Sequence, residues 1–318
     1  MRKINLKKLI NFIPIIGVIL FVYIIVDTGV EKIASSFLLI PIHFYILAAL
    51  PFILILILGS YKWKYICKKQ KMDLGIFYLI KLYLINAFYV TIIPAGLGGY
   101  IKIFYIKKKS KASIEKSIIN TLIDLTTGSV IGFFLALIGS IVIIETIPGF
   151  FPVILIFFIF NLTVFFVFMK KSGGRRFYKF FIRPLIPKKY KEKIDSSFES
   201  LYEDIPSIRD IILPFFIEIA IWTIAALQVY IIAQAFSINI PFHMFLLIHT
   251  ISVVAVVMLP ISIGGLGVRE GVFVVLLDSL YGIEPYISVV ISLSGYIVKT
   301  LIPALVGMVL TIKKESIL

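Results

Sequence analysis

Long runs of apolar residues, separated by short polar stretches, dominate the chain. The runs are continuous and lack the apolar–polar alternation at period two that is typical of membrane β-strands. A stretch of about 20 apolar residues is long enough to cross the hydrocarbon core of a bilayer as a helix. We therefore expect an all-α, polytopic membrane protein with about six full spans. These spans are expected at residues 9–27, 37–59, 113–144, 150–169, 211–236 and 284–312.

Two further apolar segments, residues 73–106 and 237–283, do not fit as single crossings. Cationic clusters flank both ends of the first segment, which places both of its ends on one side of the membrane. The span before the second segment, 211–236, starts beside a cationic cluster, and the span after it, 284–312, ends at Lys313 and Lys314. The second segment therefore begins and ends on the opposite side of the membrane. We therefore predict two re-entrant, broken-helix hairpins that enter from opposite faces. Irregular backbone at membrane depth is tolerated where protein buries it or where it lines a wet cavity.

The two predicted bends resemble each other in sequence. PAGLGG at residues 94–99 and PISIGG at residues 260–265 share a proline, a small residue, a branched aliphatic residue and a glycine pair. A cation follows each bend, Lys102 or Arg269. Such an inverted repeat is typical of transporters whose substrate sites lie at broken helices near the midplane. We expect one membrane domain, 1–318, with a first half at about 1–169, an amphipathic connector at 170–210 and a second half at 211–318.

Composition and charge agree with a membrane location. Hydrophobic residues make up 60% of the chain and charged residues 15%, which a soluble domain of 318 residues could not accommodate. The formal net charge is +15, but the cations gather at both termini and in three inter-helix clusters. Cytoplasmic loops carry such clusters, so we expect a cytoplasmic-membrane protein with both termini in the cytoplasm and no binding of nucleic acid. The connector suits an interfacial helix on anionic lipid, with partner binding as the alternative.

Cysteine and histidine give no indication of a metal site. The single cysteine, Cys67, is assigned to a lysine-rich loop and cannot form an intrachain disulfide. The three histidines, His43, His243 and His249, are scattered along the chain. Since no Cys/His cluster is present in the sequence, neither a metal nor another cofactor is expected.

The glycine bends are the first candidates for a binding site. A bend followed by a new helix offers free N–H groups and the positive end of the helix dipole, which together bind anions. Arg269 adds a planar guanidinium that suits two phosphate oxygens, and Glu270 is expected to hold this arginine or another cation. The alternative is a glycine bend for tight helix packing, with a structural Arg–Glu pair.

Polar residues on two predicted spans extend this site. Asp124 lies on a stripe of serine, threonine and asparagine at helical spacing, and Lys299 lies on a similar stripe of the last span. The buried cations Lys102, Arg269 and Lys299 could face Asp124, Glu218, Glu270 or Asp278. We expect a polar cavity between the repeats, with scattered structural pairs as the alternative. The predicted substrate-binding residues are Arg269, Glu270, Gly264, Gly265, Gly267, Lys102, Gly98, Gly99, Asp124 and Lys299.

At these residues the chain resembles the flippase-like family named for the lysylphosphatidylglycerol synthase transmembrane region. The motifs are PISIGGLGVREG (260–271), PAGLGGYIKIFYI (94–106), the stripe that ends in LID with Asp124, and YIVKTLIPALVG (296–307). The resemblance implies an integral lipid translocase. In two-domain relatives a separate soluble domain makes the aminoacylated lipid, and we expect this chain not to make it. Relatives commonly carry Glu-Arg at Asn120 and Thr121 and often arginine at Lys299, so headgroup preference does not carry over.

The function that we expect is a lipid flippase or related transporter for a phosphate-containing lipid. Arg269, Lys102 and the half-helix N-termini would hold the phosphate of an anionic headgroup. One alternative is a membrane enzyme acting on a polyprenyl-phosphate or a glycolipid, but we find no catalytic constellation for it. Another is a scaffold subunit for a separate lipid-modifying enzyme. Membrane lipids are the expected partners, and a homodimer remains open.

Overall fold

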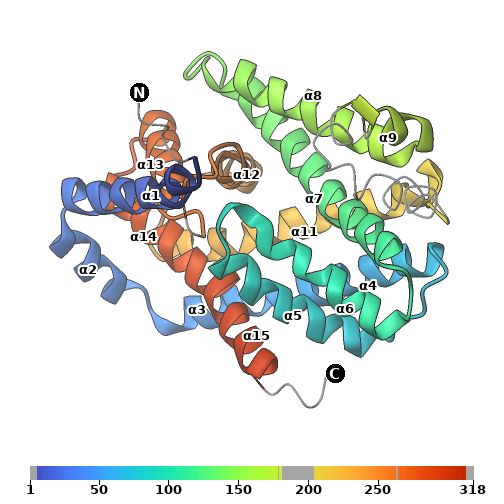
Figure 1. Ribbon diagram of the computed structural model, residues 1–318. Helices are drawn as coiled ribbons and strands as arrows, with labels where there is room; N and C mark the ends of the chain where they lie inside the picture. Colours follow the sequence, from blue (N-terminus) through green and yellow to red (C-terminus); the bar gives the residue numbers. More distant parts are fainter. Residues whose placement is uncertain (1–5, 178, 181–203, 263, 313–318) are drawn as a thin grey trace.

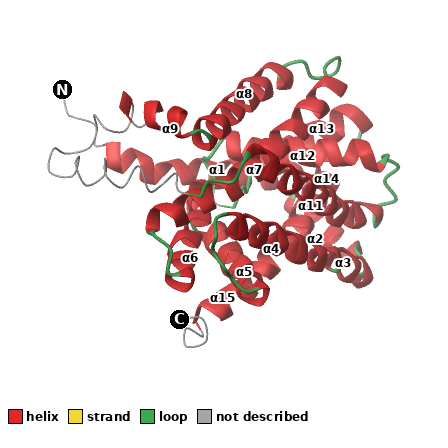
Figure 2. Cartoon of the chain, turned by 90° about the vertical axis from the view of Figure 1, so that its right-hand side faces the viewer, coloured by secondary structure: helices red, strands yellow, loops and turns green. Residues whose placement is uncertain are grey.

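The computed structural model describes residues 6–177, 179–180, 204–262 and 264–312, and these residues form a bundle of helices (Figure 1). No strand occurs among them, and short loops join the helices (Figure 2). The predicted all-α fold class is therefore confirmed. The continuous apolar runs explain it, since a helix satisfies its backbone hydrogen bonds within one segment.

The described chain up to Phe177, which includes the start of the connector, contains nine helices and the first broken segment. The helices are α1 (Leu6–Thr28), α2 (Val30–Leu39), α3 (Ile42–Ala49), α4 (Pro51–Lys69), α5 (Ile76–Ile92), α6 (Lys102–Ser110), α7 (Ile114–Val142), α8 (Phe150–Met169) and α9 (Lys171–Phe177). The 3₁₀ segment η1 (Pro94–Ile101) joins α5 to α6.

The second half repeats the use of broken helices. It contains α11 (Ile208–Gln234), α12 (Phe242–Met258), α13 (Val268–Tyr281), α14 (Pro285–Tyr296) and α15 (Ile302–Ile312). The π-helical turn η4 (Ile297–Leu301) joins α14 to α15. In an α-helix the N–H of residue 303 would bind the carbonyl of residue 299, but Pro303 has no N–H. The proline therefore explains why the helix is irregular at Lys299.

Five of the described helices are long and apolar enough to cross a membrane: Ile42–Lys69, Ile114–Val142, Phe150–Met169, Ile208–Gln234 and Pro285–Ile312. The predicted spans 113–144, 150–169, 211–236 and 284–312 each coincide with one of them. The predicted first span, 9–27, lies within α1, of which Ile16–Thr28 is a shorter apolar helix. The described chain is therefore that of a multi-pass membrane protein.

The second predicted span, 37–59, is placed wrongly. The structure has a separate helix α2, and the long helical stretch runs from Ile42 to Lys69. Cys67, predicted to lie in a lysine-rich loop, is buried in α4, and so is the nearby Lys62. The loop was predicted from the clustered cations of this segment. Lys62 is one of these cations, but it is not in a loop, because it pairs with Asp124 and Glu218 inside the bundle.

The two broken segments form helical hairpins that open toward opposite ends of α7. Lys71, before α5, and Lys116, after α6, both contact Asp204, with Nζ–Oδ distances of 2.5 and 2.9 Å. The ends of the α5–η1–α6 hairpin therefore meet near the start of α7. Both ends of the α12–α13 hairpin instead join one core cluster with Ile143, just after α7. This arrangement agrees with the inverted repeat, while the depth of the bends in a bilayer stays a prediction.

Only the ends of the connector 170–210 are described. The predicted amphipathic face, Ile194, Phe198 and Leu201, lies outside the described residues, whereas Ile205 packs against a core cluster with Ile211. Asp210 caps α11 together with Ser207 and forms an ion pair with Lys69, whose Nζ lies 2.6 Å from Asp210 Oδ1. The end of the connector is therefore attached to α4 beside the first hairpin.

We predict that Lys71 and Lys109, which flank the first hairpin, are accessible from the same side of the membrane. Single cysteines at these exposed positions in a Cys67→Ser background should react alike with a membrane-impermeant maleimide. Glu145→Cys, in the loop after α7, is the control and should show the opposite accessibility. Labelling of one flank without the other would contradict the hairpin.

Candidate functional site

Four buried ionisable residues, three from the first half and one from α11, form a compact group that we call the lysine–carboxylate cluster: Lys62, Lys102, Asp124 and Glu218. They come from α4, α6, α7 and α11, and all four are buried. Lys62 Nζ lies 2.6 Å from Asp124 Oδ1, and Lys102 Nζ lies 2.5 Å from Asp124 Oδ2. Lys62 also pairs with Glu218. Two cations and two carboxylates thus balance, so the formal charge of the cluster is zero.

Neutral polar side chains complete the surroundings of this cluster. The ammonium of Lys102 lies 4.5 Å from the centre of the Trp63 ring, a cation–π contact. Trp63 Nε1 donates to Asn120 Oδ1 at 2.8 Å, and Asn120 Nδ2 donates to Gln70 Oε1 at 2.7 Å. The charges therefore have partners within the protein, and the cluster fastens four helices together.

A second polar site lies beside the PISIGG bend, around a cavity of about 320 Å³ that we call the Arg269 cavity. α5, α12, the bend, α13 and η4 provide its walls. Its polar lining consists of Thr91, Ser262, Gly264, Gly265, Arg269, Lys299 and Thr300. The remaining lining is apolar: Val90, Ile93, Val253, Val256, Val257 and Pro260. Residues 90–93 directly precede the other bend, so segments next to both bends contribute to one cavity.

Arg269 is held firmly at the start of α13. Its Nε donates to Glu270 Oε1 at 3.0 Å and to Ser292 Oγ at 3.2 Å, and its Nη2 also donates to Glu270. The guanidinium carbon lies 4.5 Å from the centre of the Tyr296 ring. These contacts fix the planar group at the edge of the cavity, which explains why an arginine and a glutamate stand side by side here.

Glu270 binds groups of the protein and is not among the residues that line the cavity. Its Oε2 accepts the N–H of Gly267 at 2.7 Å, which caps the first turn of α13. Gly267 has a φ of +87°, and a Cβ there would lie 2.5 Å from the carbonyl oxygen of Gly17 in α1. Only glycine suits this backbone at such a close approach. Since Glu270 uses the Gly267 N–H, fewer N–H groups of this helix end are available to a ligand than the sequence suggested.

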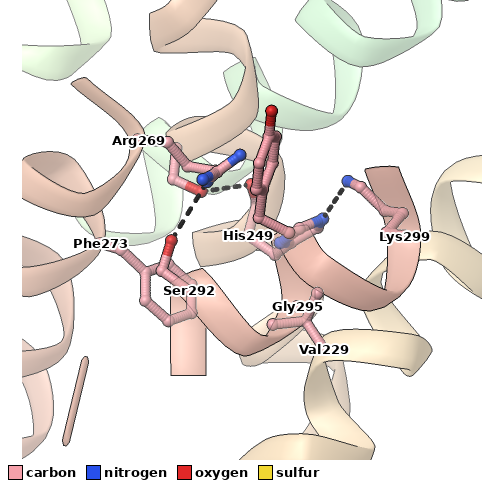
Figure 3. A pocket seen from close by; sticks show the side chains of 9 residues that line it. Val229, His249, Arg269, Phe273, Ser292, Gly295 and Lys299 are labelled. Atoms are coloured by element: carbon pink, nitrogen blue, oxygen red, sulfur yellow. Dashed lines mark hydrogen bonds between the residues drawn. The ribbon is translucent and has the colours of Figure 1, made fainter. Parts of the chain in front are cut away.

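Lys299 differs from the other buried cations because no carboxylate among the described residues forms an ion pair with it. Its Nζ lies 3.2 Å from His249 Nε2 (Figure 3). Arg269 and Lys299 both line a second void of about 10 Å³, which is roughly the space of one water molecule. The two cations thus flank a common space between α13 and η4.

The single predicted constellation is divided between these two places. Gly264, Gly265, Arg269 and Lys299 line the cavity, and Gly267 and Glu270 support Arg269 from behind. Lys102 and Asp124 lie in the lysine–carboxylate cluster, and Gly98 and Gly99 pack against Tyr89 and Leu125. Asp278, a candidate partner for the cations, is exposed on α13. The cause of this division is Lys62, which joins Asp124 and Glu218 in a group of their own.

Three contributing residues were missed as parts of a site: Lys62, His249 and Tyr296. A signal for Lys62 existed, because Lys62, Ile66 and Gln70 continue the helical spacing beyond residue 59 and are all buried. His249 is a lone histidine in an apolar helix, a pattern that also fits an ordinary core residue. Tyr296 is distant from Arg269 in the sequence, and the tertiary structure brings its ring into contact with the guanidinium.

Comparisons with known proteins place these features in a family context. The family described as lysylphosphatidylglycerol synthase TM region matches residues 11–307. A UPF0104 membrane protein of Pyrococcus horikoshii is 24% identical over 326 residues, which cover 96% of this chain and 97% of the relative. The match extends over both hairpins, the lysine–carboxylate cluster and the Arg269 cavity.

We predict that Glu218→Leu destabilises the protein by about 3–5 kcal/mol, because Lys62 and Lys102 then share one carboxylate inside the bundle. Adding Lys62→Met should restore most of the loss, since it removes the surplus cation. Thermal unfolding of the purified protein in detergent measures both effects. A double variant that is less stable than Glu218→Leu would show that the cluster is not held by charge balance.

Proposed function

Since this chain belongs to the lysylphosphatidylglycerol synthase TM region family, we propose that it moves a phosphate-containing lipid between the two leaflets of its membrane. One observation carries the proposal. The Arg269 cavity joins an apolar wall to two cations, and the described residues provide a carboxylate partner for only one of them. This combination suits a ligand that has a phosphate at one end and hydrocarbon at the other.

The energetics of charge in a membrane favour such a ligand. A lysine or arginine at the centre of a membrane helix costs at least about 2.5–3.5 kcal/mol on insertion scales. A bound phosphate would offset this cost at Lys299. The guanidinium of Arg269 is held at the same cavity, and its planar fork is well suited to phosphate oxygens. The lipid phosphate would thus be the counter-charge that the described part of the chain does not provide at Lys299.

The arrangement of the hairpins provides a route for the lipid. Two broken helices open toward opposite ends of α7, and residues next to each bend line the same cavity. We propose that the bends are re-entrant and lie near the midplane of the cytoplasmic membrane, with both termini in the cytoplasm. Rocking of the two halves would then expose the cavity to one leaflet at a time.

The polar lining of the cavity favours transport over catalysis. The described lining residues include two cations and several hydroxyl groups but no carboxylate. Hydrolysis or transfer at a lipid phosphate usually needs a general base or a metal held by carboxylates. We therefore propose a transporter that binds its lipid without changing it.

We predict that Val253→Trp abolishes lipid movement, because the indole would fill the Arg269 cavity that Val253 lines. The variant protein should be reconstituted into vesicles with a fluorescent phospholipid, and exposure of the label to a membrane-impermeant quencher should be followed. At least about a tenfold fall in rate is expected, corresponding to a barrier higher by roughly 1.4 kcal/mol.

Val275→Trp is the matched control. Val275 lies on α13, is exposed at 48% of its surface and does not line the cavity. It should transport at the wild-type rate. Equal rates for Val253→Trp and wild type would rule out the cavity as the route.

A further inference from the structure

The formal charges at the Arg269 cavity do not balance. Arg269 and Lys299 line it and carry two positive charges, whereas Glu270 provides one negative charge. The difference is one positive charge, and it resides at Lys299, which contacts His249 and pairs with no carboxylate of the described residues. By contrast, the lysine–carboxylate cluster is neutral. The lysine–carboxylate cluster therefore needs no further counter-charge, whereas the Arg269 cavity needs one negative charge.

From this balance we infer that the transported lipid has an anionic phosphodiester headgroup without an amine. The inference rests on the proposed function and names its substrate class. A phosphodiester brings one negative charge, which matches the surplus at Lys299. A phosphomonoester would bring about 1.5 to 2 negative charges at neutral pH and overcompensate. A zwitterionic or cationic headgroup would leave the surplus in place.

Among the described residues, no carboxylate is free at this cavity to pair with an ammonium. Both oxygens of Glu270 are in use, Oε1 by Arg269 and Ser292 and Oε2 by the N–H of Gly267. The other carboxylates that are buried in the described chain, Asp124 and Glu218, bind lysines in the separate cluster. An amine in the cavity would thus lose its water without gaining a carboxylate, and it would lie near two cations.

No aromatic ring is among the described residues that line the cavity, so none offers the amine an alternative there. A ring face can hold an ammonium through a cation–π contact. At this site the Tyr296 ring already holds the guanidinium of Arg269, at 4.5 Å. The cavity therefore selects against amines by repulsion as well as by the absence of a partner, and repulsion of the wrong ligand is a common source of specificity.

The size of the cavity assigns the headgroup to it and not the whole lipid. Its volume of about 320 Å³ is at the lower end for small-molecule sites. The acyl chains would leave past the apolar side of the cavity, where Val257 and Pro260 are exposed. This apolar exit separates a lipid from a free phosphate ester, since the free ester has no chains to place there.

The inference is tested by measuring the affinity of the purified full-length protein in detergent for short-chain lipids that differ only in headgroup. The probes are phosphatidylglycerol, phosphatidic acid, phosphatidylethanolamine and lysyl-phosphatidylglycerol, with soluble glycerol 3-phosphate as the chain-free probe. We expect phosphatidylglycerol to bind at least about tenfold more tightly than each of the others, a difference of roughly 1.4 kcal/mol. The free ester should bind weakly because it lacks the chains.

Variants at Lys299 test the cause of the selectivity. Lys299→Gln should bring the preference for phosphatidylglycerol over phosphatidylethanolamine close to one, because the surplus charge is removed. Lys299→Arg should keep the preference. The matched control is Lys81→Gln on the exposed side of α5, which removes a cation elsewhere and should leave the preference unchanged. Should Lys299→Gln fail to fold, the wild-type ratios alone decide.

Each outcome separates the inference from the proposed function. Equal or tighter binding of the amine lipids or of phosphatidic acid would overturn the inference and leave lipid transport standing. Binding of glycerol 3-phosphate as tight as that of phosphatidylglycerol would assign the cavity to a soluble ester and overturn both. Absence of binding by every lipid would also overturn both.

Discussion

The structure depends on one constraint, the need of every charge buried among apolar helices for a counter-charge. In the lysine–carboxylate cluster, Asp124 lies between Lys62 and Lys102, and Glu218 of α11 completes the balance. These residues come from four helices, so charge pairing also sets how the helices pack. A buried pair is weak evidence for stability by itself, but losing one partner is costly, because the remaining charge is left alone.

The second half satisfies the same constraint only in part. Arg269 has Glu270 and Ser292, whereas Lys299 has His249 at 3.2 Å. Breaks in the helices position these groups: Arg269 follows a glycine bend, and Lys299 lies in a π-helical turn before Pro303. π-Helical turns occur frequently at functional sites. We propose that the incomplete balance at a broken helix distinguishes a binding site from a structural cluster made of the same residue types.

Much of this arrangement could be predicted from the sequence. The apolar runs predict the helices, the proline–glycine motifs predict both breaks, and helical spacing places Asp124 on a buried stripe. Arg269 and Lys299 were recognised as buried cations because they interrupt apolar segments. Each of these features is local, since it depends on residues within a few turns of one another.

The pairing of the charges could not be predicted in this way. Lys62 belongs to a run of cations, and such runs usually mark cytoplasmic loops. Its contacts with α7 and α11 in the folded protein show instead that it is buried. The sequence left open whether Glu270 holds Arg269 or another cation, and the structure adds that it caps its own helix. Whether two charges meet depends on tertiary packing, which single-sequence patterns do not contain.

The central claim is that the phosphate of a membrane lipid completes the charge balance at Lys299. An experimental structure of the protein in a phosphatidylglycerol bilayer tests it most directly. We expect density for a lipid phosphate in the Arg269 cavity, with oxygens about 2.7–3.2 Å from the nitrogens of Arg269 and Lys299. A well-resolved cavity that holds only water, with lipid phosphates ordered elsewhere on the protein, would contradict it.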